Sequence, residues 1–256
     1  MPELARVVVT GGASGMGAAI VAAFAAEGRS VVSMDVADDA GREIAEKATA
    51  TGPGRVTYLH CDVADRDEVE QAFGRAAELC GGLDVLVHAA GIAPGSPAEA
   101  IDVAEWDRVL EVNTRGTFLT NVAAHALLAE AGGRILNFAS AAGAQGYPGK
   151  AHYAASKGAV LAWTRSVAQE WGHLGITVNA LAPGISTPMY ARTRAAMSPE
   201  QLAAHDLDLS RRIPLDGRLG DVDRDLVPVV SFLAGPGARF ITGQTIAVDG
   251  GMLMVR

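Results

Sequence analysis

Apolar residues recur along this chain in short β-branched runs that alternate with longer stretches of helical periodicity. The runs are typical of strands and cover residues 6–10, 30–34, 56–61, 85–88, 134–139, 177–182 and 245–248. The first six are almost continuously apolar, as expected for parallel strands that are covered on both faces. The stretches between the runs predict helices over residues 15–27, 39–50, 66–79, 102–131, 153–173 and 222–234.

This alternation predicts an α/β protein with a Rossmann-type, doubly wound parallel sheet of about seven strands flanked by helices. Pro and Gly occur at turns and are not collected into a linker, so residues 1–256 are expected to form a single domain. The one irregular region is residues 184–218, which contains a helix-like segment over 199–209. An excursion of this length after a strand is typical of a lid over a binding site.

The bulk composition excludes several classes of protein. Of the 256 residues, 49% are hydrophobic and 20% are charged, which supports a sizeable core and argues against disorder. The net charge is −8 and no run of Lys and Arg occurs, so we expect no nucleic-acid partner. No apolar run reaches the roughly 18 residues that a membrane span needs, so no membrane partner is expected either.

Cysteine and histidine usage indicates an ordinary cytoplasmic protein. Cys61 and Cys80 are the only cysteines and form no Cys-x-x-Cys pair, so two reduced thiols are expected. The first six residues lack the pattern of a signal peptide. The histidines have no metal-ligand spacing, and we expect no bound metal.

The first predicted strand runs into the glycine-rich segment Thr10-Gly-Gly-Ala-Ser-Gly-Met-Gly17, and a predicted helix follows. Glycines allow a tight turn and a close backbone approach to a pyrophosphate, and the helix N-terminus adds free N–H groups. The alternative is a simple tight turn, but the position between strand and helix favours dinucleotide binding. The candidate contacts are Gly11, Ser14, Gly15, Met16 and Gly17.

Asp35 ends the second predicted strand, 18 residues beyond Gly17. A carboxylate at this point can accept hydrogen bonds from both ribose hydroxyls of NAD and would repel the 2′-phosphate of NADP. The neighbouring residues 34, 36 and 37 supply no base to hold that phosphate. The alternative is a helix-capping or loop acid. We expect NAD as the cofactor.

Asp62 follows the third predicted strand and leaves two interpretations open. Its carboxylate could accept a hydrogen bond from the adenine amino group, or it could cap the helix that begins near Asp65.

Tyr153 and Lys157 lie four residues apart on a predicted helix, which places the phenol and the ammonium on one face. A tyrosine ordinarily loses its proton near pH ~10, and a fixed positive charge nearby lowers that pKa. The pair could therefore act as a proton donor and acceptor near neutral pH. Taken alone, the spacing also arises by chance in many helices.

Together these segments resemble the short-chain dehydrogenase/reductase family over nearly the full length of the chain. Seven segments occur in the family's order. The motifs that carry the resemblance are residues 10–17, Asp62-Val63, Asn113, Ser140, Tyr153-Ala-Ala-Ser-Lys157, residues 179–184 with Thr187-Pro188, and residues 243–251.

The resemblance implies hydride transfer between a bound nicotinamide and a carbonyl carbon, with four catalytic residues. Tyr153 would exchange the proton with the substrate oxygen, and Ser140 would hydrogen-bond that oxygen. Lys157 would lower the phenol pKa and bind the nicotinamide ribose, and Asn113 would hold a water near Lys157. The further cofactor contacts that it implies are Val63, Ala90, Gly91, Pro183, Gly184, Ile185 and Thr187, with Ile185 acting through its backbone.

One segment departs from the family pattern. The family usually has Asn-Asn-Ala-Gly after the fourth strand, whereas this chain has His88-Ala89-Ala90-Gly91. Ala89 cannot make the hydrogen bonds of an Asn, so we expect a local stability cost of about 1 kcal/mol at most and no loss of activity. We expect His88 to pack within the sheet.

The substrate is expected to be bounded by residues 93–97, 141–149 and 190–212. These segments are mostly small or apolar, which predicts a secondary alcohol and ketone pair of modest size. His152 is expected at the surface, and Arg192 and Arg194 on a solvated face of the lid. The candidate substrate contacts are Ala142, Gln145, Tyr147 and Tyr190. The resemblance also implies self-association into a homotetramer.

Two other functions are compatible with the sequence. One is a 3-oxoacyl-thioester reductase, which would favour NADPH and a basic residue near Asp35. The other is a catalytically silent NAD-binding regulator, against which the intact set of Ser140, Tyr153, Lys157 and Asn113 argues.

Overall fold

The computed structural model describes residues 5–254, except for the side chain of Met189. Its centre is one parallel sheet with the strand order β3-β2-β1-β4-β5-β6-β7. The predicted strands are confirmed, each within one residue at either end. The strands are β1 Arg6–Thr10, β2 Ser30–Asp35, β3 Arg55–His60, β4 Val85–His88, β5 Gly133–Phe138, β6 Ile176–Pro183 and β7 Thr245–Val248.

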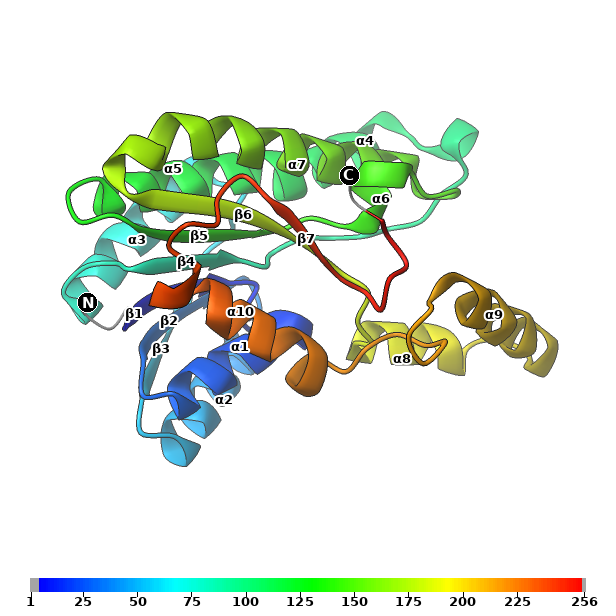
Figure 1. Ribbon diagram of the computed structural model, residues 1–256, viewed down its shortest axis with the longest axis horizontal. Coiled ribbons are helices and arrows are strands. Elements are labelled where there is room, and N and C mark those ends of the chain that lie inside the picture. The colour runs from blue at the N-terminus through cyan, green and yellow to red at the C-terminus, as the bar shows by residue number, and fades with distance from the viewer. Residues whose placement is uncertain (1–4, 255–256) are drawn as a thin grey trace.

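Helices cover both faces of this sheet, as Figure 1 shows, so the predicted doubly wound arrangement is confirmed. One core cluster packs α1, α2 and α10 on one face, and a second packs α3, α5 and α7 on the other. Successive residues of β1 alternate between the clusters, as the strand pleat requires. The helices are α1 Gly15–Ala26, α2 Asp38–Thr51, α3 Arg66–Cys80, α4 Val103–Leu110, α5 Gly116–Leu128, α6 Ala141–Gln145, α7 Ala151–Trp171, α8 Pro188–Ala195, α9 Pro199–Arg212 and α10 Val227–Leu233.

The long helix predicted over residues 102–131 is interrupted. A π-helical segment, Glu111–Arg115, separates α4 from α5, and a similar segment, Val222–Leu226, precedes α10. Two short helices, α6 and α8, were not predicted, because five to eight residues are too few to display a helical period. Both begin at a hydroxyl N-cap, Ser140 and Thr187, which are predicted site residues.

The carboxyl ends of all seven strands meet at one edge of the sheet, because every strand pair is parallel. Helices α8 and α9 project beyond this edge (Figure 1). They lie within the segment 184–218, where the lid is expected. Ligands of open α/β sheets bind at this edge, so the candidate site is located here. No helix within residues 5–254 is long and apolar enough to cross a membrane.

Candidate active site

The glycine loop between β1 and α1 is tightly folded. Gly11 and Gly15 have φ angles of +70° and +54°, which favour glycine. A Cβ on Gly11 would lie 2.7 Å from the amide nitrogen of Ala90, so the loop also contacts the end of β4 closely. Ser14 is the N-cap of α1, but its side chain makes no capping hydrogen bond. The first N–H groups of α1 therefore remain available to an anion.

Asp35 ends β2 and faces this loop. One carboxylate oxygen accepts the Ala13 N–H at 3.0 Å, and the other accepts the Ala37 N–H at 3.0 Å. The residue therefore fixes the glycine loop against β2, and it does not cap α2, whose N-cap is Ala37. Each carboxylate oxygen can accept a further hydrogen bond, because a carboxylate has about four acceptor positions.

Asp62 lies after β3, and its carboxylate accepts the Ala64 N–H at 2.9 Å. The interpretation that Asp62 caps the next helix is wrong, because the N-cap of α3 is Asp65, which accepts the Glu68 N–H at 3.0 Å. No donor within residues 5–254 contacts the second Asp62 oxygen, so it can accept another hydrogen bond.

A cavity of about 440 Å³ extends over the ends of β1 to β4. The predicted cofactor residues that line it are Gly11, Ser14, Met16, Gly17, Asp35, Asp62, Val63, Ala90 and Gly91. Gly15 is not among the lining residues. The cavity is also lined by residues that were not predicted from the sequence to contact the cofactor. They are Val36, Cys61, Ala89, Ile92, Arg108 and Val112. The sequence does not predict that Arg108 lines this cavity, because its position depends on how α4 packs at this edge of the sheet.

Ser140 and Tyr153 meet at the carboxyl end of β5. Ser140 caps α6 by accepting the Ala142 N–H at 3.1 Å, and its side chain also hydrogen-bonds to Tyr153. Burial raises the pKa of Tyr153, and the hydrogen bond from Ser140 offsets part of that rise. This direction is opposite to the one expected from the sequence, because desolvation of the phenolate dominates.

Lys157 lies one helical turn after Tyr153 on α7 and is almost fully buried. Its Nζ is 5.9 Å from the centroid of the Tyr153 ring and donates a hydrogen bond to the Phe138 carbonyl at 2.6 Å. Burial lowers the pKa of Lys157 to about 8. The ammonium can therefore release its proton near neutral pH, unlike an ordinary lysine.

Asn113 lies in the π-helical segment and connects three parts of the site. Its side chain accepts the Ile92 N–H at 2.8 Å and donates to the Ile92 carbonyl at 2.9 Å and to Ser156 Oγ at 3.0 Å. A Cβ on Gly91 would lie 3.1 Å from Asn113 Oδ1 and 3.3 Å from Lys157 Nζ. The absence of that Cβ leaves a small space bordered by both polar groups.

His88 packs within the sheet, as expected. Its Nδ1 is 2.8 Å from Thr10 Oγ1 and 3.1 Å from Thr120 Oγ1. Burial, together with the charge of Lys157, lowers the His88 pKa to about 3, so the imidazole is neutral near pH 7. Its Nε2 has no hydrogen-bond partner among the described residues.

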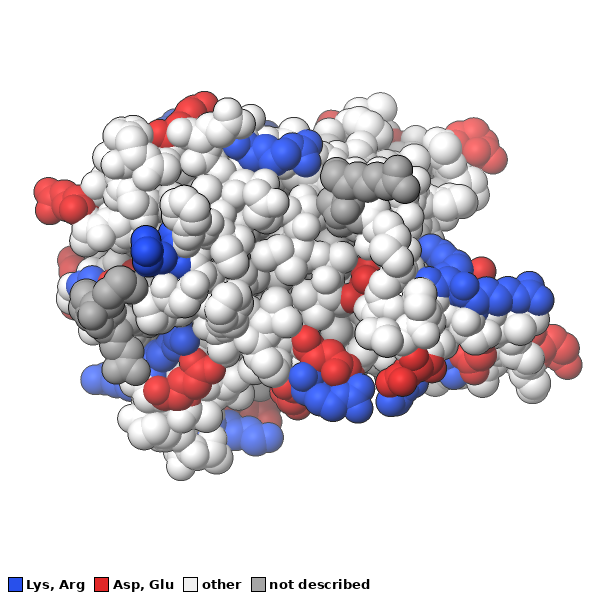
Figure 2. All heavy atoms as spheres, viewed as in Figure 1, with Lys and Arg blue, Asp and Glu red and all other residues white. Residues whose placement is uncertain are grey.

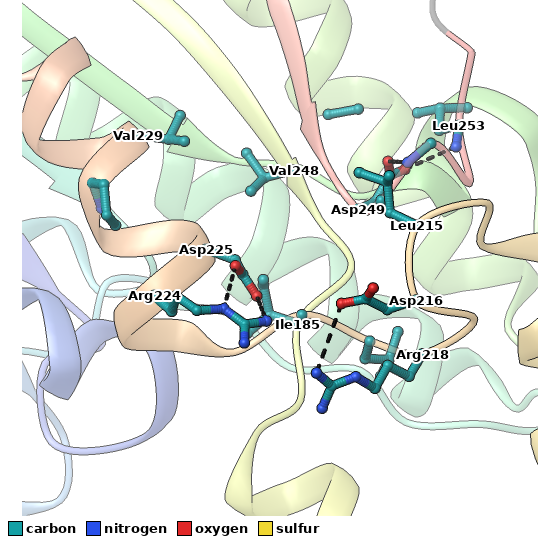
Figure 3. A pocket seen from close by; sticks show the side chains of 16 residues that line it. Ile185, Leu215, Asp216, Arg218, Arg224, Asp225, Val229, Val248, Asp249 and Leu253 are labelled. Atoms are coloured by element: carbon teal, nitrogen blue, oxygen red, sulfur yellow. Dashed lines mark hydrogen bonds and ion pairs between the residues drawn. The ribbon is translucent and has the colours of Figure 1, made fainter.

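The predicted contacts after β6, Pro183, Gly184, Ile185 and Thr187, do not line the cavity of about 440 Å³. Gly184 donates its N–H to the Val248 carbonyl at 2.8 Å, directly after Pro183, the last residue of β6. Ile185 lines a second cavity of about 580 Å³. Figure 3 shows the ion pairs Arg224–Asp225 and Arg218–Asp216 beside it. Thr187 accepts the Tyr190 N–H at 3.3 Å and so caps α8.

The predicted substrate contacts differ in burial and in their hydrogen-bond partners. Ala142 is buried in α6, whereas Gln145 and Tyr147 are exposed. The Tyr190 hydroxyl is 2.7 Å from Nε2 of His205 and accepts a hydrogen bond from Arg194, so it takes part in the contact between α8 and α9. Arg194 also pairs with Asp206.

The expectation that His152 lies at the surface is wrong. The side chain is fully buried at the start of α7, and its Nε2 is 2.9 Å from Glu105 Oε1 on α4. Ser96 Oγ donates to the same carboxylate at 2.9 Å. Neighbouring positions on a helix face different directions, and the packing of α4 covers this one, which the sequence did not reveal.

Comparison with known proteins identifies proteins that are similar to this chain over nearly its full length. A family model described as enoyl-(acyl carrier protein) reductase matches residues 11–253. The chain is 38% identical over 250 residues to trans-4-hydroxycyclohexanecarboxylate dehydrogenase of Sinomonas cyclohexanicum, covering 95% of this chain and 91% of that protein. It is 35% identical over 249 residues to 3-oxoacyl-[acyl-carrier-protein] reductase FabG of Thermotoga maritima, covering 96% and 97%. A short-chain type dehydrogenase/reductase from Mycobacterium ulcerans superimposes with a TM-score of 0.90 at 28% identity, covering 97% and 89%.

Proposed function

The chain belongs to the short-chain dehydrogenase/reductase family and is an oxidoreductase of that type, and we propose that it uses NAD(H) to interconvert a secondary alcohol and a ketone. The observation that carries this proposal is the convergence of Ser140, Tyr153, Lys157 and Asn113 at the carboxyl edge of the sheet. Since the protein is an oxidoreductase, a catalytically silent regulator is set aside.

The described residues fit a dinucleotide. The loop around Gly11 approaches Ala90 so closely that no Cβ fits between them, and the free N–H groups of α1 face the same cavity. Asp35 supplies a carboxylate for the ribose hydroxyls, and its neighbours Val36 and Ala37 supply no base for a 2′-phosphate. These features support NAD over NADP.

Bound NAD would supply the hydride acceptor in the oxidative direction. Loss of hydride from an alcohol carbon requires the hydroxyl proton to leave as well, and the phenolate form of Tyr153 accepts it and becomes the phenol. Ser140 hydrogen-bonds the substrate oxygen and fixes its orientation. Burial raises the pKa of Tyr153. We expect the positive charge of Lys157 to oppose that rise, because a nearby cation favours the phenolate. Asn113 Oδ1 holds a water in the space above Gly91, through which the proton reaches solvent.

The names of the relatives direct the choice of substrate. The Sinomonas protein is named for a secondary alcohol on a ring that also bears a carboxylate. We therefore place hydroxycarboxylates first among the alcohols to be tested, followed by neutral cyclic alcohols.

The second candidate is reduction of a 3-oxoacyl thioester, which the name of the Thermotoga relative favours. We expect this reaction to favour NADPH, and Asp35 argues against that cofactor.

A substrate screen with all four cofactor forms tests the proposal. Absorbance at 340 nm would follow NAD or NADP with a panel of secondary alcohols. It would also follow NADH or NADPH with the matching ketones and 3-oxoacyl thioesters. We expect turnover of at least one alcohol with NAD. Turnover confined to NADPH and the thioester would establish the second candidate instead.

A further inference from the structure

Lys150 is a second cation beside Tyr153. It is the N-cap residue of α7, three positions before the tyrosine, and its Nζ lies 5.8 Å from the centroid of the tyrosine ring. Lys157 lies at almost the same distance, 5.9 Å. Only three lysines occur in the whole chain, and the third, Lys47, is exposed on α2. Two of three lysines therefore flank the proposed general base.

The Lys150 side chain reaches the loop that bounds the substrate site. Its Nζ donates to the Ala93 carbonyl at 3.0 Å, in the connection from β4 to α4. The backbone of the same connection is tied to the residue before Lys150, since Ser96 N–H donates to the Gly149 carbonyl at 2.9 Å. The ammonium thus lies between Tyr153 and a segment that is expected to bound the substrate.

Lys150 has no counter-ion within the described part of the chain. An ammonium has three N–H donors, and the Ala93 carbonyl is the one protein acceptor found for it among residues 5–254. The carboxylate of Glu105 binds Ser96 and His152 instead. Lys150 is partly buried, which lowers its pKa. A partly desolvated cation gains free energy when a ligand brings an anion to it.

Two other cations near the site, Arg194 and Lys157, are less suited to this role. Arg194 on α8 already pairs with Asp206 and with the Tyr190 hydroxyl. Lys157 is almost fully buried and donates to the Phe138 carbonyl.

We propose that Lys150 binds a carboxylate of the substrate, so that the substrate class is hydroxycarboxylates and the corresponding oxocarboxylates. This inference rests on the proposed function, because it assumes that the alcohol is oxidised at Tyr153. The charge–charge hydrogen bond would fix one end of the substrate and leave its carbinol carbon beside Tyr153 and Ser140.

Matched substrates and variants test this proposal. NAD-dependent oxidation of 4-hydroxycyclohexanecarboxylate would be compared with that of its neutral methyl ester. For Lys150→Met and Lys150→Gln we expect the KM for the acid to rise by about 10- to 100-fold, as for the loss of a charged hydrogen-bond partner. The KM for the ester should change by less than about twofold on the same argument. Lys150→Arg should restore much of the loss, and Lys47→Met should change neither value.

A binding measurement separates this inference from the proposed function. Cyclohexanecarboxylate has no hydroxyl to oxidise, so calorimetry with the NADH-loaded protein reports anion binding without turnover. The inference predicts binding that weakens in Lys150→Met and Lys150→Gln, each first checked for normal NADH binding as a sign of correct folding.

Two results would overturn the inference while leaving the proposed function intact. One is wild-type oxidation of the ester, or of neutral alcohols, with a KM as low as that for the acid. The other is an equal rise in KM for acid and ester in the variants, which would assign Lys150 a structural role. Failure of every alcohol to reduce NAD, with cyclohexanecarboxylate binding still dependent on Lys150, would refute the proposed function alone.

Discussion

Three buried polar side chains, Asn113, Lys157 and His88, lie near the carboxyl edge of the sheet. Asn113 has protein partners for both of its amide hydrogens. Among the residues that the structure describes, Lys157 has one hydrogen-bond partner, the Phe138 carbonyl, and His88 Nε2 has none. Buried polar groups without full partners reduce stability. A cluster of such groups is typical of functional sites, where residues that are needed for the reaction reduce the stability of the fold.

His88 should make the protein sensitive to acid. Its pKa is near 6.5 in the unfolded chain and about 3 in the folded one, so between these values only the unfolded state takes up the proton. The free energy of unfolding should fall as the pH drops from 6.5 towards 3, by up to about 1.4 kcal/mol per unit. Urea unfolding at several pH values measures this slope. The His88→Asn variant should show a shallower slope, and an unchanged slope would contradict the pKa shift.

Asp35 should determine the choice of cofactor. Asp35→Ala removes the negative charge that would repel a 2′-phosphate and also one acceptor for the Ala13 N–H. We expect the ratio of kcat/KM with NAD to that with NADP to fall by about tenfold or more, from loss of one charged hydrogen-bond acceptor. Equal wild-type rates with NADH and NADPH would contradict the assignment of NAD.

Lys150 should make the KM for an anionic substrate depend on pH, because burial lowers the Lys150 pKa below the ordinary lysine value of 10.5. An anionic substrate binds to the protonated ammonium, so its KM should rise as the pH increases through the Lys150 pKa. The KM of the neutral ester should not follow this curve. Steady-state kinetics between pH 7 and pH 10 compares the two, and parallel curves would contradict the role of Lys150.

Sequence spacing predicted the location of a candidate site residue where that location depends only on the local backbone. The glycine loop, Asp35 after β2 and the Tyr153–Lys157 turn are of this kind. The burial of His152, the direction of the Tyr153 pKa shift and the contact of Lys150 with Ala93 depend on packing between distant segments. Lys150 did leave a signal in the sequence, because it precedes Tyr153 by almost one helical turn in a chain with few lysines.

Among the structural elements, strands were predicted almost to the residue because short apolar runs rich in β-branched residues are typical of buried parallel strands. The interrupted helix between α4 and α5 was not predicted, since a π-helical turn preserves the apolar pattern on both sides. This turn has a functional consequence, because Asn113 lies within it and reaches both Ile92 and Ser156.

We expect α8 and α9, which lie in the segment proposed as a lid, to open as a unit. Arg194–Asp206 and Tyr190–His205 connect them, while Leu209 is the one residue of α9 that is buried, so few apolar contacts hold the pair to the sheet. Asp206→Asn should increase amide hydrogen exchange in both helices with little change in the overall melting temperature. Hydrogen-exchange mass spectrometry resolves this, and faster exchange restricted to α9 would argue against a single unit.

At the scale of the whole molecule, the surface suggests self-association. Figure 2 shows that charges gather over α8 to α10, whereas the centre of this face, over β7, is largely uncharged. Phe240 and Phe232 are 93% and 52% exposed, and Val103, Trp106 and Phe118 form further exposed apolar positions on α4 and α5. Exposed apolar residues are typical of subunit contacts, so we expect these positions to take part in self-association.

We expect a homotetramer of about 105 kDa, four times the chain mass of 26.3 kDa. Phe240→Asp should reduce it to a dimer, because a charge in an apolar interface is costly to desolvate. Size-exclusion chromatography with light scattering measures both masses. A monomeric wild-type protein at micromolar concentration would contradict the expectation.

The most direct test of the account is a comparison of wild-type protein with Tyr153→Phe. The substitution removes only the hydroxyl that is proposed to exchange the proton, while the ring and the cofactor cavity remain. We predict that kcat for the best alcohol falls by at least about 10³-fold, consistent with loss of a general acid–base. NADH binding, followed by fluorescence, should stay within a few-fold of wild type. Retention of wild-type turnover by Tyr153→Phe would contradict the central claim.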